Sequence, residues 1–337
     1  MEIRGGNYVE FASRTITMRF GHWSGPFGVE REFFSRLIAE TSGCSVEIKS
    51  DEYGGPVDVN IESVYGASSV PDLQSRMYRF IHSKMPGGIP FDGGRHTPNQ
   101  QPSIKSKLNI FFTAENERPP EGDWDLYFSF DVHSFRDRNH YLPLWWITTT
   151  DLLFPKVSPW LGKPVTINEL MSPRATSFQN RKKFCVAFIG KAYPFRMHSL
   201  SALTQIGKVD VYGGIARNSK RAGAVKKYEI AQEYRFFYAF ENDLYPGYVT
   251  EKAPEAWATG AVPLYWGLDV TNSLNSKAMI NLADFGSLDD FIENVKEVND
   301  SEEKWTRIAS QPLLIKKPSL DQIKSALRRA LLEKGVI

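Results

Sequence analysis

The second half of the chain alternates short apolar runs with helical patterns, and this alternation most constrains the fold. The strand-like runs occupy residues 184–190, 208–214, 234–240, 262–266 and 278–282. Between the first two, apolar residues recur at helical spacing, from Met197 through Leu200 and Leu203 to Ile206. Strands linked by helices through short connections form parallel sheets covered on both faces. This half is therefore predicted to be a Rossmann-like α/β domain.

The first half repeats the pattern less regularly. Its strand-like runs occupy residues 16–20, 45–49, 57–62 and 107–112, with a helical stripe of Val29, Phe33 and Leu37 after the first. A loop-rich insertion at 83–106 is dense in Gly and Pro, and long loops of this kind are often functional. A chain of 337 residues exceeds what one hydrophobic core usually serves. A second α/β domain is therefore predicted here.

Prolines without clear periodicity mark residues 152–182 as an interdomain linker. We therefore expect an N-terminal domain over 1–160, a C-terminal domain over 161–318 and a terminal helix over 319–337. The terminal helix carries its apolar residues on one face and several basic residues elsewhere. Docking onto the body of the protein is favoured for such a helix, and contact with a membrane surface is the alternative.

Composition narrows the class of protein. Hydrophobic residues make up 42% and charged residues 24%, and no segment reaches the roughly 18 apolar residues of a membrane span. The first residues lack the apolar core of a secretory signal, which favours a cytoplasmic location, with peripheral contact at the inner membrane surface as the membrane alternative. A net charge of +2 with interspersed signs gives no case for nucleic acid. Cys44 and Cys185 lie in strand-like runs and are predicted to be buried free thiols.

The stretch ENDLYPGYVTEK, residues 241–252, follows a strand-like run and precedes a helix that is predicted to end at Gly260. Ligands of parallel sheets bind beyond the carboxyl ends of the strands. Lys252 opposes the helix macrodipole in the first helical turn, and an anionic ligand would offset that cost. Taken singly, Glu251 could be a dipole partner and Asn242 could form an Asx-turn. Together these residues predict an anion-binding loop.

Residues 234–267 resemble the donor-binding signature of the α-1,3/4-fucosyltransferases, glycosyltransferase family 10, in its bacterial soluble form. The pattern FENS, Y-x-TEK and G-x-x-P-x-x-x-G is met in order, except that Asp243 stands where serine is usual. The segment FFTAENERPP, residues 111–120, resembles another family segment, with Ala114 in place of glycine. The resemblance extends from about residue 108 to 310, and the first hundred residues match only loosely.

This resemblance implies the GT-B architecture, in which the parallel sheets of two Rossmann-like domains face a central cleft. GDP-fucose would bind mainly to the C-terminal domain and the acceptor mainly to the N-terminal one. The implied reaction is an inverting transfer of L-fucose from GDP-β-L-fucose to a hydroxyl of N-acetylglucosamine. The expected acceptor is N-acetyllactosamine, the expected hydroxyl is O3, and the product is then of the Lewis-x type.

The resemblance also implies roles for individual residues. Glu115 corresponds to the proposed catalytic base, although the residues alone would leave Glu117 and Glu121 as rivals. Glu251 is implied to accept hydrogen bonds from sugar hydroxyls or to oppose positive charge developing on the fucosyl ring. The implied donor-binding residues are Arg196 and Lys252 at the diphosphate, with Asn242, Tyr248 and Glu251 beside them.

No tightly bound cofactor and no metal are expected. Asp123-Trp124-Asp125 resembles the metal-binding DxD motif of another glycosyltransferase class, but cationic side chains at the diphosphate make a divalent cation unnecessary. Two alternative functions stay open. One is a GT-B transferase that uses another nucleotide sugar, and the other is a non-catalytic bilobal sugar-binding protein, which would need an export signal and no diphosphate-binding cations.

Overall fold

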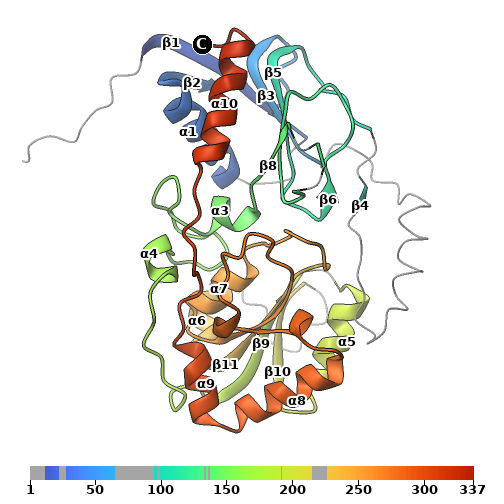
Figure 1. Ribbon diagram of the computed structural model, residues 1–337, viewed down its shortest axis with the longest axis vertical. Coiled ribbons are helices and arrows are strands. Elements are labelled where there is room, and N and C mark those ends of the chain that lie inside the picture. Colours follow the sequence, from blue (N-terminus) through green and yellow to red (C-terminus); the bar gives the residue numbers. More distant parts are fainter. Residues whose placement is uncertain are drawn as a thin grey trace, which may run out of the picture.

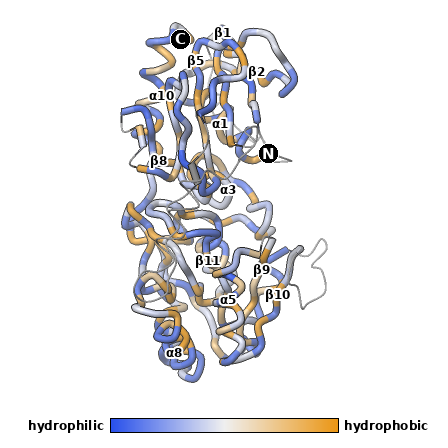
Figure 2. The backbone as a smooth tube through the Cα atoms, turned by 90° about the vertical axis from the view of Figure 1, so that its right-hand side faces the viewer, coloured by the Kyte–Doolittle hydropathy of each residue, from blue (hydrophilic) through white to orange (hydrophobic). Residues whose placement is uncertain are grey.

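The computed structural model describes residues 12–22, 28–64, 95–96, 99–132, 134–135, 137–190, 192–214 and 226–337. These residues form two α/β bodies stacked along the long axis of the molecule (Figure 1). Figure 2, viewed from the side, has α1, α10 and β5 in one body and β9, β11 and α8 in the other. Most of the predicted 83–106 loop lies outside the described residues.

The N-terminal body is built on a parallel sheet with the strand order β2-β1-β3-β5-β7-β8. These strands are β1 (Ala12–Gly21), β2 (Cys44–Ile48), β3 (Val57–Glu62), β5 (Ser106–Phe112), β7 (Leu126–Ser129) and β8 (Asn139–Tyr141). A separate short pair joins β4 (Arg95–His96) to β6 (Glu117–Arg118). Helix α1 (Gly28–Ser42) covers the sheet with a buried stripe that includes the predicted Phe33 and Leu37.

The C-terminal body is built on a second parallel sheet, ordered β10-β9-β11-β12-β13. Its strands are β9 (Lys183–Ile189), β10 (Val209–Gly213), β11 (Tyr234–Phe240), β12 (Val262–Trp266) and β13 (Ile280–Asn281). Its helices include α5 (Pro194–Leu203), α6 (Lys227–Ala231), α7 (Lys252–Ala258), α8 (Leu288–Asn299) and α9 (Glu302–Ala309). The two predicted α/β regions are therefore confirmed.

The last predicted strand, 278–282, is shorter than expected. Asn275 and Asn281 cap 3-10 turns on either side of β13 by accepting hydrogen bonds from the backbone N–H groups of Lys277 and Ala283. Asparagine side chains compete in this way with extended structure. Helix ends elsewhere follow their local sequence. Ser287 caps the start of α8 by accepting a hydrogen bond from the Asp290 N–H at 3.1 Å. Gly260 has a φ of +85° just after α7, where the helix was predicted to end.

The predicted linker, 152–182, is a packed segment rather than a solvated one. It contains the short helix α4 (Ile167–Leu170), which Thr166 caps. Leu161 and Leu170 are buried in a hydrophobic core that includes residues of both sheets. The helix α3 (Leu144–Thr148) precedes this segment. The linker thus joins the two bodies through shared core contacts.

The terminal helix α10 (Asp321–Glu333) returns to the N-terminal body and lies beside α1 (Figure 1). Its predicted apolar face is buried, with Ile323, Leu327 and Leu331 in the core. Lys324 pairs with Glu40 of α1 at 2.9 Å, and Arg328 donates to the Thr41 carbonyl at 3.1 Å. Docking is therefore confirmed. The apolar face that a membrane would need is used inside the protein.

Two further expectations concern the described residues. Cys44 and Cys185 are both buried and free, as predicted. In the part of the chain that the structure describes, the helices are all too short or too polar to cross a bilayer.

Candidate active site

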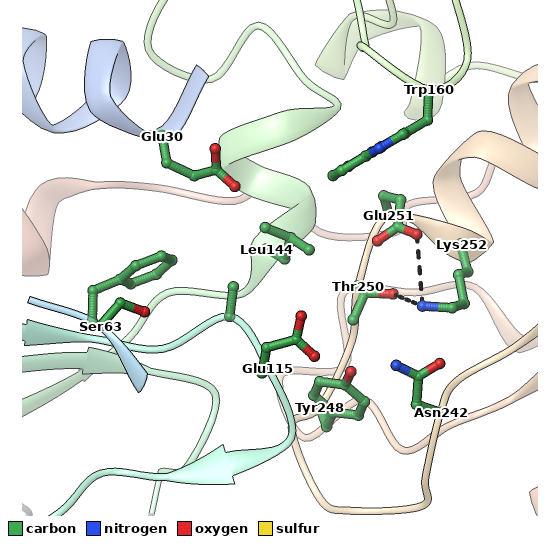
Figure 3. A pocket seen from close by; sticks show the side chains of 12 residues that line it. Glu30, Ser63, Glu115, Leu144, Trp160, Asn242, Tyr248, Thr250, Glu251 and Lys252 are labelled. Carbon is green, nitrogen blue, oxygen red and sulfur yellow. Dashed lines mark hydrogen bonds and ion pairs between the residues drawn. The ribbon is translucent and has the colours of Figure 1, made fainter. Parts of the chain in front are cut away.

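A cavity of about 180 Å³ lies between the two bodies (Figure 3). Both bodies supply its walls. The lining residues are Glu30, Ser63, Phe112, Ala114, Glu115, Leu144 and Trp160 from the first part of the chain, and Asn242, Tyr248, Thr250, Glu251 and Lys252 from the second. Ser63 follows β3, Glu115 follows β5 and Asn242 follows β11, so the cavity lies at the carboxyl ends of both parallel sheets.

Glu241 does not line the cavity, but it forms hydrogen bonds with residues of the C-terminal wall. It follows β11, is fully buried and accepts hydrogen bonds from the N–H of Thr250 at 2.8 Å and its hydroxyl at 2.6 Å. The hydroxyl of Tyr265 also donates to Glu241, at 3.3 Å. Burial raises the pKa of Glu241, although Lys252 opposes the shift. These contacts hold the loop 241–252 in one conformation.

Lys252 is the cation of this wall. Its Nζ lies 3.2 Å from a carboxylate oxygen of Glu241 and 3.6 Å from one of Glu251, and it donates to the Thr250 hydroxyl at 2.8 Å. Burial alone would lower the pKa of Lys252, but the two carboxylates more than offset it and raise the pKa. The sequence predicts that an anionic ligand offsets the charge of Lys252 in the first helical turn. Glu241 and Glu251 supply negative charge beside Lys252 before any ligand binds.

Glu251 is a carboxylate in the same cluster. Burial would raise its pKa, but Lys252, followed by Lys227, lowers it below the ordinary value. Glu251 therefore carries its negative charge inside the cavity, beside the Lys252 ammonium (Figure 3).

Arg196, on α5, lies behind Asn242 rather than in the lining of the cavity. It is 3% exposed, and its Nη1 donates to the Asn242 side chain at 2.9 Å. Among the described residues its buried Nε has no hydrogen-bond partner. Arg196 therefore orients Asn242 and keeps one further N–H available for a hydrogen bond.

Tyr248 lines the cavity and contacts both bodies of the protein. It is buried, and its ring packs edge-on against Phe130 of the N-terminal body, with 5.2 Å between centroids. Burial raises the pKa of Tyr248 well above its ordinary value, and the nearby Glu115, Glu241 and Glu251 charges add to the rise. Its hydroxyl therefore stays protonated and is available as a hydrogen-bond donor.

Glu115 comes from the loop after β5, and its carboxyl group points into the cavity (Figure 3). The loop is fixed by hydrogen bonds to the Glu115 carbonyl from the Glu117 N–H at 2.7 Å and the Thr113 hydroxyl at 3.2 Å. Glu117 lies in β6, and Glu121 is exposed. Of these three acids, Glu115 alone lines the cavity.

Comparison with known proteins indicates which family and fold the chain resembles. Residues 178–309 match the family model described as "Glycosyltransferase family 10 (fucosyltransferase) C-term". The C-terminal body thus resembles the C-terminal domain of glycosyltransferase family 10. An "Alpha-(1,3)-fucosyltransferase" of Helicobacter pylori is 24% identical over 295 residues, which span 77% of this chain and 61% of the relative. A human "3-galactosyl-N-acetylglucosaminide 4-alpha-L-fucosyltransferase" is 28% identical over 54% of this chain and 46% of its own length. The chain thus spans less than two thirds of these curated relatives.

Solved structures match the whole architecture. A structure described as "Crystal Structure of alpha1,3-Fucosyltransferase with GDP" has a TM-score of 0.65 and 20% identity over 96% of this chain and 93% of that one. The same protein class "with GDP-fucose" gives a TM-score of 0.63 at 18% identity, over 96% of this chain and 93% of that chain. The predicted GT-B fold is therefore confirmed.

The Asp123-Trp124-Asp125 motif does not line the cavity. Trp124 is buried and donates to the Gln100 carbonyl at 2.8 Å. Asp125 accepts from the Asn109 N–H at 2.7 Å and pairs with Lys334 after α10 at 2.5 Å. Trp124 and Asp125 thus have structural partners. The described residues contain no cluster of three or more His, Cys, Asp or Glu side chains suited to a metal.

Sequence reasoning missed Glu30, Trp160 and Glu241 in this candidate site. Glu30 had a detectable signal, because it shares the helical face of Phe33, Phe34 and Leu37, where an acid is out of place. Glu241 is the first residue after a buried strand and opens the loop already singled out. Trp160 lies in the segment interpreted as linker, where no periodic pattern marked it.

Proposed function

We propose that the chain is an inverting α-1,3-fucosyltransferase that transfers L-fucose from GDP-β-L-fucose to O3 of N-acetylglucosamine in an acceptor such as N-acetyllactosamine. The observation that carries this proposal is one cavity that receives Lys252, Asn242 and Tyr248 from the family 10 domain and Glu115 from the opposite body. The relatives described as α-1,3-fucosyltransferases support the choice of reaction.

In the proposed reaction, Glu115 removes the proton from the attacking acceptor hydroxyl. The new bond forms between that oxygen and C1 of fucose while the bond from C1 to the GDP oxygen breaks, so a β-linked donor yields an α-fucoside. Lys252 and Arg196 stabilise the charge of the departing diphosphate. Glu251 accepts hydrogen bonds from fucose hydroxyls or opposes the positive charge that develops on the ring.

A second acidic residue is not needed in this scheme. A glycosidase must protonate a poor alkoxide leaving group, whereas a nucleoside diphosphate leaves as a stable anion. We propose that Lys252 and Arg196 suffice for the diphosphate, that no tightly bound cofactor takes part and that a divalent cation is not required. We also propose a cytoplasmic location, where nucleotide sugars are made.

The test is a glycan-acceptor screen with GDP-fucose, followed by linkage analysis of the product. We expect transfer to N-acetyllactosamine with an α-1,3 linkage. GDP-mannose and UDP-galactose serve as donor controls and should not be consumed. Turnover of another nucleotide sugar in preference to GDP-fucose would overturn the proposed donor, and binding of free fucose with no transfer would favour a sugar-binding protein.

A further inference from the structure

Glu30 is a buried carboxyl group that the proposed chemistry does not use. It lies in the first turn of α1, is 4% exposed and lines the cavity. Figure 3 shows its carboxyl group directed into the cavity from the side opposite to Lys252. Among the described residues its Oε2 is buried and has no hydrogen-bond partner. An unpaired buried oxygen of this kind destabilises a protein, so a compensating role is expected.

The surroundings of Glu30 indicate which ligand would satisfy it. The opposite wall holds the Lys252 ammonium and the Asn242 amide, which suit a diphosphate and its sugar. The Ser63 hydroxyl lies instead on the same side of the cavity as Glu30, and the ring of Trp160 lies between Glu30 and Glu251 (Figure 3). One polar group beside an aromatic face is the usual lining for an uncharged ligand such as a sugar.

Burial favours the protonated form of Glu30, and the negative charge of Glu251 adds to this effect. The carboxylates of Glu251 and Glu115 and the ammonium of Lys252 share the cavity with it. Burial raises the pKa of Glu30 to about 7, with Glu251 adding to the rise and the backbone N–H of Glu30 opposing it. A protonated carboxyl group can donate one hydrogen bond and accept another, whereas a carboxylate only accepts. Glu30 can therefore bind a sugar hydroxyl without adding charge next to the proposed base.

We propose that Glu30 is an acceptor-binding residue, whose Oε2 forms a hydrogen bond with a hydroxyl group of the acceptor sugar other than the attacking one. This inference rests on the proposed fucosyl transfer. It makes Glu30 a determinant of acceptor choice in the N-terminal body. The contact also positions the sugar so that the attacking hydroxyl faces Glu115.

The experiment compares wild type with Glu30→Ala, Glu30→Gln and the control Glu32→Ala. Glu32 lies on the exposed side of the same helix, where it pairs with Arg36 at 2.7 Å. Steady-state transfer from GDP-fucose to N-acetyllactosamine is measured. We expect Glu30→Ala to raise the acceptor KM about tenfold, the usual effect of losing one hydrogen bond, with the GDP-fucose KM unchanged. Glu30→Gln, which keeps a donor and an acceptor, should stay within about threefold of wild type.

A panel of monodeoxy N-acetyllactosamines then separates a direct contact from a structural effect. For one analogue, wild type should lose about tenfold in kcat/KM while Glu30→Ala loses nothing further, which is the signature of two interacting groups. If every deoxy analogue weakens both proteins equally, the Glu30 inference is overturned and the transferase function stands. If wild type transfers no fucose from GDP-fucose at all, the proposed function itself fails and this inference with it.

Discussion

The two walls of the cavity differ in how the buried carboxyl groups Glu241 and Glu30 are paired. On the C-terminal wall, Glu241, Thr250 and Lys252 form a buried network whose charges compensate one another. On the N-terminal wall, Glu30 leaves one oxygen without a partner among the described residues. A polar network whose hydrogen bonds are already formed is preorganised for one ligand. A buried polar group without a hydrogen bond can form one with a ligand that varies.

The difference suggests that the C-terminal wall binds the donor and that the N-terminal wall selects the acceptor. A donor that never changes can be held by a rigid wall, while acceptors vary in their hydroxyl groups and need a few selective contacts. If both walls responded alike to mutation, their different pairing would have no functional consequence. Four predictions test this comparison.

The largest expected effect is on the rate of fucose transfer, through the proposed base Glu115. Glu115→Gln should lower kcat by about 10²–10⁴-fold, the usual contribution of a general base, and leave GDP-fucose affinity unchanged. Transfer rates and a direct titration of GDP-fucose measure the two quantities. A variant that transfers fucose at the wild-type rate would show that another group removes the proton.

Next in size is Lys252→Met, which removes the cation of the paired wall. It should raise the KM for GDP-fucose by about 10- to 100-fold, because a charge-assisted hydrogen bond contributes about 1.5–3 kcal/mol. It should also lower the free energy of unfolding by about 3 kcal/mol, because Glu241 would be left buried without its partner.

The double variant Lys252→Met, Glu241→Gln separates these two effects. Removal of the orphaned charge should recover much of the unfolding free energy but none of the donor affinity. The control is Lys324→Met, which breaks an exposed pair with Glu40 and should cost less than about 1 kcal/mol. Urea unfolding and donor kinetics provide both readouts, and recovery of donor affinity in the double variant would contradict a binding role for Lys252.

A smaller effect tests the unpaired wall through pH. The pKa of Glu30 is raised from an ordinary value of 4.5 to about 7. Below pH 4.5 the group is protonated in both states; between pH 4.5 and about 7 the unfolded chain releases the proton while the folded protein keeps it, so stability falls with rising pH until the folded group also ionises. Glu30→Gln should remove this loss. Its unfolding free energy should exceed that of wild type more at pH 8 than at pH 5, by up to about 3 kcal/mol. An equal difference at both pH values would rule out the shifted carboxyl group.

The smallest expected effect is at the Asp123-Trp124-Asp125 motif. Asp123→Asn should leave the transfer rate within about twofold, as is usual for surface substitutions, because the motif does not line the cavity. A chelator such as EDTA should likewise leave the wild-type rate unchanged. A rate that collapses with the chelator and returns with Mg²⁺ would require a metal in the reaction.

Much of the architecture could be predicted from the local pattern of apolar and turn residues. The strands β9, β10, β11 and β12 were predicted within one residue at each end, because buried parallel strands are short, mainly apolar runs with turn residues beside them. The strand β13 was overestimated because asparagine side chains form caps that propensity alone does not weigh against a strand.

The residues of the candidate site could be predicted only in part from local sequence patterns. The loop 241–252 could be singled out because polar residues crowd beyond a buried strand. Within it, the pairing of Lys252 with Glu241 could not be foreseen, since either acid or a ligand could have compensated the charge. Choosing Glu115 over Glu117 needed a family resemblance, because neighbouring acids in one loop differ only in the direction their side chains take.

The sequence by itself determined the two parallel sheets and the loop that ends the strand before residue 241, because hydrophobic periodicity and turn chemistry act over a few residues. The tertiary structure alone decided that Glu30 faces Lys252 across one cavity and that α10 packs beside α1. Contacts between residues more than 200 positions apart depend on how the two bodies pack, and that packing is a property of the whole chain rather than of any segment.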